Sequence, residues 1–162
     1  MTDSNFSKTK IIHQLNRFVA NELSAADVYT CAIDNIFHAD VREKLEMVHD
    51  QHLERAKLLQ MRILDLGGMP RSKGDYALPN YQLYQLLEAS NCAPGEKVVV
   101  MALEDEEAKS LEDYRHISCI LDEASANLIL TDLLPGQTKI RKSMKTLTQS
   151  FHRFSYLGLA RQ

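Results

Sequence analysis

The sequence is poor in the residues that interrupt helices and build tight turns. Its 162 residues include six glycines, four prolines and no tryptophan. Because sandwiches and barrels need many Gly- or Pro-containing turns, neither fold is expected. With 44% hydrophobic and 25% charged residues, the composition is that of a globular protein. We therefore expect a single domain over residues 1–162, with its core at about 8–150 and an apolar C-terminal tail at 151–162.

Disulfide patterns, long apolar runs and a strong net charge are also missing. Cys31, Cys92 and Cys119 are widely spaced and odd in number, which argues against a disulfide framework or a structural zinc site. The sequence contains no apolar run of about 18 residues, and its start lacks the apolar core of a signal peptide. We therefore expect a cytoplasmic protein without a membrane span. The formal net charge of −3 argues against a broadly basic nucleic-acid binder.

Apolar residues recur at steps of three and four in four long segments, which predicts four helices. The segments cover approximately residues 8–37, 40–66, 94–121 and 122–151. Asp40 is the expected N-cap of the second helix, the Gly-Gly pair at 67–68 should end it, and the Pro-Gly pair at 135–136 should kink or break the fourth. The expected fold is all-α, an antiparallel four-helix bundle with a short crossover helix at 79–90 between the second and third long helices.

One polar residue interrupts each apolar stripe near its middle. These residues are Glu22, His52, Glu107 and Gln137, one in each predicted helix. Helices packed along their lengths would bring the four side chains into one layer inside the bundle. A buried carboxylate must be paired, protonated or coordinated to a metal ion, since an isolated charge is costly in an apolar interior.

Further candidate ligands lie one turn away from two of these residues. His49 precedes His52 by three residues, and Glu104 precedes Glu107 by three, so each pair shares a helix face. The candidate metal ligands are therefore Glu22, His49, His52, Glu104 and Glu107. Such a mixed oxygen and nitrogen set suits iron, manganese or zinc better than calcium or magnesium.

The same residues also have a purely structural interpretation. Glu22 could lie at the edge of the bundle with its carboxylate in water, and a single His52 is more often a core histidine than a ligand. The acidic run at 104–107 is, by itself, typical of a solvated face. Without a metal, Gln137 could donate to a carboxylate, and Arg141 could reach inward to Glu22 or Glu107. The layer would then be a buried polar network that sets helix register.

Three stretches resemble the ferritin-like superfamily. Residues 21–29 (NELSAADVY) are similar to the first helix of bacterioferritins and rubrerythrins, in which the Glu matching Glu22 is a di-iron ligand. Glu104-x-x-Glu107 with Tyr114 resembles the third helix of rubrerythrins, and residues 62–70 (RILDLGGMP) resemble the characteristic end of the second helix. Over most of residues 10–150 the chain is most similar to a small, uncharacterised branch of ferritin-like four-helix-bundle proteins in bacteria.

The sequence departs from the pattern of a complete di-iron site. Such a site takes a Glu from each of two helices and a Glu-x-x-His pair from each of the other two. The second helix offers His49-x-x-His52, or Glu46-x-x-His49 one turn earlier, and the apolar stripe favours the former. The fourth helix offers Gln137, with no carboxylate or histidine before His152. We therefore expect one metal ion or none, rather than two.

Charge is distributed unevenly over the second half of the chain. Residues 96–123 contain nine acidic and three basic residues, whereas residues 135–162 contain six basic residues and no acidic one. This pattern favours third and fourth helices that pack side by side and balance each other's charge. A nucleic-acid partner is not expected, because six charges without interleaved aromatic residues form no known recognition pattern.

Two functional hypotheses follow. The first is a ferritin-like metal-binding protein in which bound iron supports ferrous oxidation or other dioxygen or peroxide chemistry, with Tyr29 and Tyr114 hydrogen-bonding around the ligands. The second is a non-catalytic bundle that has lost the metal site and acts as a structural or stress-related interaction protein. Whether the protein is an enzyme stays open. The apolar tail should fold back or contact another subunit, so we expect a homo-oligomer, a dimer or larger.

Overall fold

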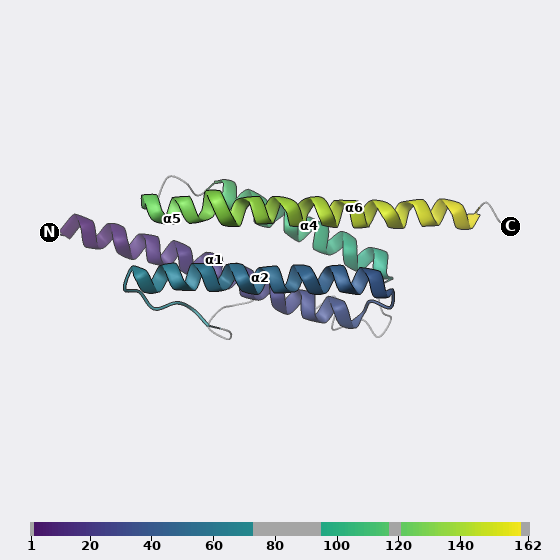
Figure 1. The fold of residues 1–162 in the computed structure, drawn as a ribbon, viewed down its shortest axis with the longest axis horizontal. Coiled ribbons are helices and arrows are strands. Elements are labelled where there is room, and N and C mark those ends of the chain that lie inside the picture. Colours follow the sequence, from purple (N-terminus) through teal and green to yellow (C-terminus); the bar gives the residue numbers. More distant parts are fainter. Residues whose placement is uncertain (1, 73–94, 117–120, 160–162) are drawn as a thin grey trace.

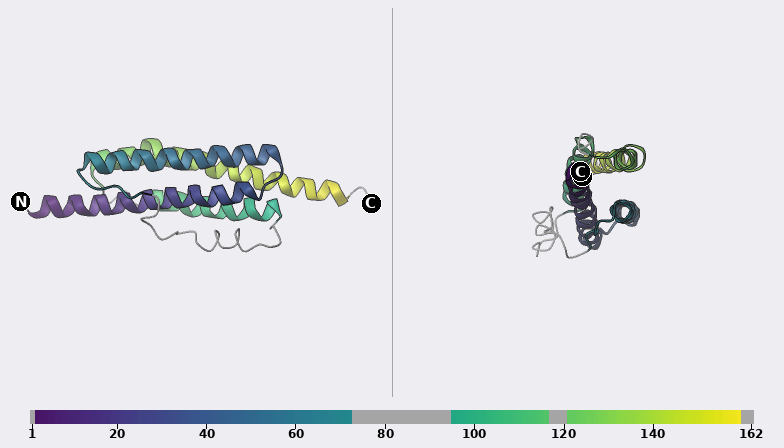
Figure 2. Two further views of the ribbon diagram at one scale, coloured as in Figure 1. Left: turned by 90° about the horizontal axis from the view of Figure 1, so that it is seen from below. Right: turned by 90° about the vertical axis from the view of Figure 1, so that its left-hand side faces the viewer.

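A computed structural model describes residues 2–72, 95–116 and 121–159 of the chain. The helices in these ranges are α1 (Thr2–Asp34), α2 (Ala39–Asp65), α4 (Glu96–Arg115), α5 (Glu123–Asn127), the π-helical segment η1 (Leu128–Leu133) and α6 (Leu134–Leu159). Four long rods lie side by side (Figures 1 and 2), with α1 packed on α2 and α4 packed on α6. The predicted all-α four-helix bundle is confirmed, whereas the crossover helix expected at 79–90 lies outside the described residues.

The direction of the helices requires a long connection between the α1–α2 hairpin and the α4–α6 hairpin. α1 and α6 run one way along the bundle, and α2 and α4 run the other way (Figure 1). At one end, Glu96 at the start of α4 accepts backbone hydrogen bonds from Phe37 and His38 in the α1–α2 turn. At the other end, Arg62 of α2 donates to Ser125 Oγ and to Asp122. The end of α2 and the start of α4 therefore lie at opposite ends of the molecule.

The two ends of α2 differ in how well the sequence predicts them. Its C-terminus is a Schellman motif, in which Gly68 N–H donates to Ile63 O at 2.9 Å and Gly67 N–H donates to Leu64 O at 2.7 Å. Gly67 has a φ of 71°, which explains the glycine there. The predicted N-cap at Asp40 is wrong. The helix begins at Ala39, and Asp40 lies in its first turn. There its negative charge interacts favourably with the positive end of the helix dipole.

The fourth helix does not break at its Pro-Gly pair. Helical turns continue from Glu123 to Leu159, and the irregularity is confined to η1, which ends two residues before Pro135. Proline has no N–H to donate to the carbonyl one turn earlier, and a short π-helical segment can absorb such a local defect. Of the kink or break expected at this position, the break does not occur, because the rod continues through the proline after one altered segment.

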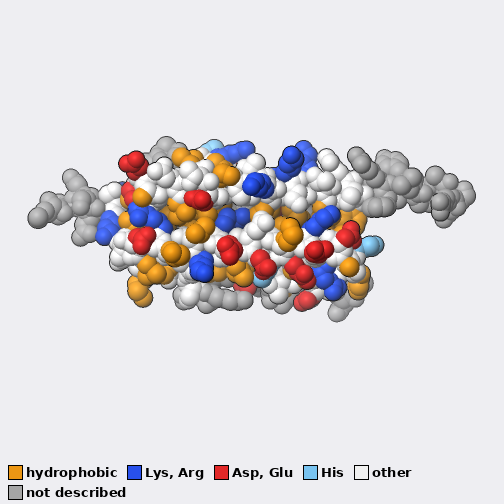
Figure 3. All heavy atoms as spheres, in the orientation of Figure 1, with side chains coloured by type: hydrophobic (Ala, Val, Ile, Leu, Met, Phe, Trp, Pro, Cys, Tyr) orange, Lys and Arg blue, Asp and Glu red, His pale blue; other side chains and the backbone are white. Residues whose placement is uncertain are grey.

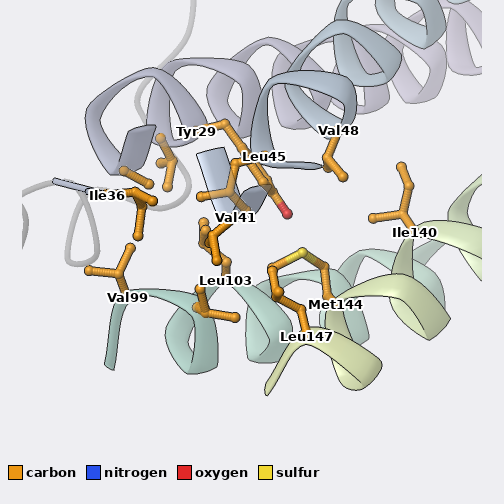
Figure 4. Close-up of a cluster of buried hydrophobic side chains, with 13 residues drawn as sticks. Tyr29, Ile36, Val41, Leu45, Val48, Val99, Leu103, Ile140, Met144 and Leu147 are labelled. Carbon is orange, nitrogen blue, oxygen red and sulfur yellow. The ribbon is translucent and has the colours of Figure 1, made fainter. Parts of the chain in front are cut away.

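Two apolar clusters fill the bundle, one toward each end. The first receives side chains from all four long helices, as the close-up in Figure 4 shows. Its buried members are Val28, Tyr29, Ala32, Ile36, Val41, Leu45, Val48, Val99, Val100, Leu103, Ile140, Met144 and Leu147. The second contains Ile11, Leu15, Phe18, Val19, Leu59, Ile63, Tyr114, Ile129 and Leu133. The polar interruptions of the stripes fall between these two clusters.

Candidate functional site: a buried ion network

The four polar residues that interrupt the apolar stripes meet in one buried layer. Glu22 of α1, His52 of α2, Glu107 of α4 and Gln137 of α6 are each at most 2% exposed. His52 Nδ1 lies 2.7 Å from Glu22 Oε2, and His52 Nε2 lies 3.0 Å from Glu107 Oε1. Gln137 Nε2 donates to Glu107 Oε2 at 2.6 Å and to the Glu107 backbone carbonyl at 3.1 Å. These residues therefore converge, as the stripe pattern predicts.

Arg55 is a fifth member of the layer, and the pattern of polar interruptions in the stripes does not predict it. It is buried, and its Nε and Nη2 lie 3.1 and 2.9 Å from Glu22 Oε2. Arg55 follows His52 by three residues, so the two side chains project from the same face of α2. That spacing, next to a stripe residue already under consideration, is the signal that could have revealed it.

Two tyrosines complete the layer in a reciprocal arrangement. Tyr29 of α1 donates from its hydroxyl to Glu107 Oε1 at 2.9 Å, while Tyr114 of α4 donates to Glu22 Oε1. Each tyrosine therefore bonds the carboxylate on the opposite hairpin. Burial and the neighbouring carboxylate both raise the pKa of each phenol, so both remain protonated donors.

The electrostatics of the layer favour the imidazolium form of His52. Its two ring nitrogens each face a carboxylate oxygen, and both can donate only when the ring carries two protons. Burial alone lowers the pKa of His52, but the Glu107 and Glu22 carboxylates outweigh it and raise the pKa to about 9. Arg55 Nη2 lies 2.8 Å from His52 Nδ1, and both nitrogens also contact Glu22 Oε2.

The two carboxylates are ionised by the same contacts. Burial raises the pKa of Glu22, but Arg55 and His52 outweigh that effect and bring it to about 2. Burial also raises the pKa of Glu107, and His52, with hydrogen bonds from Gln137 and Tyr29, lowers it below its usual range. Two carboxylates, one imidazolium and one guanidinium sum to zero charge. The layer is therefore neutral without any added ion.

All four carboxylate oxygens in the layer already have a hydrogen-bond donor. Glu22 Oε1 accepts from Tyr114, and its Oε2 accepts from His52 and Arg55. Glu107 Oε1 accepts from Tyr29 and His52, and its Oε2 accepts from Gln137. Within this layer, Gln137 Oε1 is the buried side-chain atom that has no partner in the described part of the chain.

Two of the five predicted ligands lie outside the layer. His49 Nδ1 lies 2.9 Å from Asp50 Oδ1, with the histidine side chain 25% exposed. Glu104 accepts from Arg141 Nη1 at 2.5 Å between α4 and α6. Arg141 thus pairs with Glu104 and not with Glu22 or Glu107, because Ile140, not Arg141, projects into the core.

The donor set does not fit a two-metal carboxylate centre. Such a centre needs a Glu-x-x-His pair on two of its helices. The inward pair is His52-x-x-Arg55 on α2 and Gln137-x-x-Ile140 on α6. A guanidinium has no lone pair to offer and repels cations, and an imidazolium has no free nitrogen. Residues 2–72, 95–116 and 121–159 hold no group of three or more His, Cys, Asp or Glu side chains arranged to bind a metal ion.

Comparisons with known proteins support the fold and go no further. No family model matches the chain, and no curated protein matches its sequence. A solved structure with a TM-score of 0.70 and 17% identity covers 92% of this chain and 90% of its own. It is the dodecameric thioferritin, a bacterioferritin-related protein, from Bacteroides fragilis. The chain therefore has a ferritin-like fold. None of its described helices is long and apolar enough to span a membrane.

Proposed function

We propose that this protein is a ferritin-like structural subunit in which an internal ion network replaces the metal centre, and that it assembles with copies of itself instead of catalysing oxidation. The observation that carries the proposal is the position of Arg55. Its guanidinium binds Glu22 inside the layer, where a metal-binding bundle would need a ligand.

Metal binding would have to overcome two features of this layer. A cation bound to Glu22 would displace the guanidinium or share its oxygen, and the two positive charges would repel each other. Coordination by His52 would require loss of a proton from a ring whose pKa is raised to about 9. With its charges balanced and its carboxylate oxygens occupied, the layer favours a role in holding the four helices in register.

Metal analysis of two purified proteins tests this proposal. We expect the wild type, loaded with ferrous iron, manganese or zinc at neutral pH and then desalted, to retain far less than one ion per chain. The double variant His52→Glu/Arg55→His restores a Glu-x-x-His pair on α2 and should retain more metal. His49→Ala, which lies outside the layer, is the matched control. Stoichiometric metal in the wild type, lost in Glu22→Ala/Glu107→Ala, would overturn the proposal.

Binding of a single metal ion is the second candidate function. One observation favours it: Gln137 Oε1 is buried without a partner next to Glu107, so the layer holds one unused oxygen. The layer's two carboxylates, imidazole and amide are residue types that bind iron, manganese or zinc. In this case Arg55→Gln should increase metal retention several-fold and Gln137→Leu should abolish it. Equal, near-zero retention in all three proteins excludes this candidate.

The outer face of α2 supports self-association. Five large hydrophobic side chains on this helix are between 39% and 58% exposed. They are Met47, Leu53, Leu58, Met61 and Leu64, and hydrophobic side chains are visible along α2 in Figure 3. By helical periodicity they face away from the buried stripe. Such a stripe is costly in water and is typical of a subunit contact.

A second copy of the same helix is the occupant that fits this stripe. If two α2 helices pair antiparallel about a two-fold axis near residues 55–56, Leu53 of each copy lies at the same height along the pair as Leu58 of the other. The same register sets Glu54 opposite Lys57, so each apolar pair is accompanied by a charge pair. The structural neighbour, a dodecameric protein, provides a precedent for assembly on this fold.

The oligomeric state in solution tests this surface. We expect light scattering after size-exclusion chromatography to give a dimer or larger for the wild type and a smaller species for Leu53→Glu/Leu58→Glu. Leu130→Glu introduces one such negative charge at a side chain that is 50% exposed on η1 instead of α2, and it should leave the assembly intact. A monomeric wild type at tens of micromolar would contradict self-association.

A further inference from the structure

A cavity of about 450 Å³ that is open to solvent lies between the first half of α2 and the middle of α6. Its walls carry Lys44 from α2 and Lys139 and Lys142 from α6, and Leu147 contributes apolar surface. The cavity is separate from the buried ion network, whose side chains do not line it. From these groups we infer that the cavity binds a small multiply charged anion of the phosphate class, such as a di- or triphosphate.

The charge of the cavity walls is the first argument. None of its lining residues is acidic, and none of the three lysines forms an ion pair with a residue of the described ranges. Several basic groups elsewhere are paired, as Arg62 is with Asp122, Arg141 with Glu104 and Lys109 with Glu106. Three unneutralised ammonium groups around one hollow repel each other and attract an anion.

Hydroxyl groups supply a second set of contacts. Ser143, Thr146 and Ser150 line the cavity and project from one face of α6 together with Lys139. Thr146 and Ser150 donate to carbonyls of their own helix, at 3.0 and 2.6 Å. Ser143 Oγ has no hydrogen bond to the described residues and is therefore a donor available to a ligand. Lysine ammonium groups and hydroxyls together are a common set of phosphate ligands.

The arrangement fits a small ligand better than a nucleic acid. Nucleic-acid surfaces carry basic residues along an extended track, so that several phosphates are contacted in sequence. Two other basic residues of α6 lie off the cavity wall: Arg141 pairs with Glu104, and Lys145 is not among the lining residues. The volume lies in the range of small-molecule sites. Three lysines, one from α2 and two from α6, therefore meet at one cavity.

Titration calorimetry with inorganic triphosphate provides the test. We expect saturable one-site binding to the wild type that weakens as salt is added, since the contacts are ionic. Lys142→Gln should weaken binding about tenfold by removing one charge-assisted contact. Lys145→Gln is the matched control, because it removes the same charge from the same helix one turn away but outside the cavity. It should weaken binding less than about twofold. Ser143→Met, which fills the hollow without changing charge, should abolish binding.

Three outcomes would overturn the inference. The first is no saturable binding of triphosphate at low salt. The second is equal weakening in the Lys142 and Lys145 variants, which would mean diffuse attraction to α6 as a whole. The third is tighter binding of a single-stranded DNA oligomer than of triphosphate, with a steeper salt dependence, which would mean a nucleic-acid surface. Circular dichroism of each variant establishes that the bundle is intact, so a loss of binding is then due to the change in the cavity and not to unfolding.

Discussion

The two helical hairpins contribute to the buried layer in different ways. Their first helices are equivalent: α1 and α4 each supply a glutamate and, seven residues later, a tyrosine that bonds the glutamate of the other helix. Their second helices are not. α2 supplies both cations, His52 and Arg55, whereas the inward residues of α6 at the same level are uncharged.

This difference shows where the charge balance of the layer originates. The two carboxylates come from separate hairpins, but both of the positive charges that neutralise them come from α2. Within the described part of the α4–α6 hairpin, the only side-chain donor to Glu107 is the Gln137 amide, since its hydroxyl donor, Tyr29, belongs to α1. Packing on the other hairpin, which brings His52 within 3.0 Å of Glu107, is therefore what makes that carboxylate stable in the core.

Removing one of the two cations of α2 should cause the largest loss of stability. Arg55→Ala should lower the free energy of unfolding by about 3–5 kcal/mol, because Glu22 would keep a buried charge with half of its neutralisation gone. Urea denaturation at pH 6 measures the loss. Arg115→Ala, which breaks an exposed pair with Glu112, is the control and should change stability by less than about 0.5 kcal/mol. A loss below about 1 kcal/mol for Arg55→Ala would mean that the charge of Arg55 is not needed to neutralise Glu22.

The pH dependence of stability reports the same two α2–carboxylate contacts. Since the pKa of His52 rises from 6.5 to about 9 on folding, its contribution is complete below pH 6.5 and is lost as the pH rises through 9. Since the pKa of Glu22 falls from 4.5 to about 2, its contribution is complete above pH 4.5 and is lost toward pH 2.

We therefore expect stability to be greatest near pH 5–6 and to fall by roughly 3 kcal/mol between pH 6 and 10, as measured by urea denaturation at each pH. His52→Gln should be less stable than the wild type at pH 6, and its stability should fall much less between pH 6 and 10. If the variant lost as much stability over this pH range as the wild type, the pH dependence would belong to another group.

Variants of the two tyrosines test whether α1 and α4 contribute equally to the layer. Tyr29→Phe and Tyr114→Phe each remove one buried hydrogen bond to a carboxylate and should each cost about 1–3 kcal/mol. Because the two contacts are reciprocal, the two losses should agree within about 0.5 kcal/mol and should be additive only in part, since both belong to one network. Thermal unfolding followed by circular dichroism is sufficient. A loss in one variant alone would show that the two halves are not equivalent.

The smallest effect is expected at the edge of the second hairpin. Arg141→Ala removes the pair with Glu104, which lies at the margin of the α4–α6 contact and is partly exposed. The loss should be less than about 1 kcal/mol and should shrink in high salt. Chemical denaturation at two ionic strengths provides the measurement. A loss as large as that of Arg55→Ala would place the electrostatic centre of the bundle at this pair instead of in the layer.

Parts of the site that depend on position along one helix are predictable from the sequence. The spacing of Glu22, His52, Glu107 and Gln137 on apolar stripes predicts their convergence, because a stripe must face the core wherever the helix packs. The same spacing placed His49 and Glu104 one turn away on a shared face. It could not decide that they contact Asp50 and Arg141, since that depends on the rotation of each helix and on its neighbour.

The sequence by itself determined four amphipathic helices, the stop of α2 at Gly67 and the identity of the polar residues in the core, because these follow from periodicity and from local backbone preferences. Only the tertiary structure decided that Arg55 enters the layer and that each tyrosine bonds the opposite glutamate. It also decided that the fourth helix continues past Pro135. Those outcomes depend on distances between helices, and residues from separate helices come within hydrogen-bonding reach only when the bundle has packed.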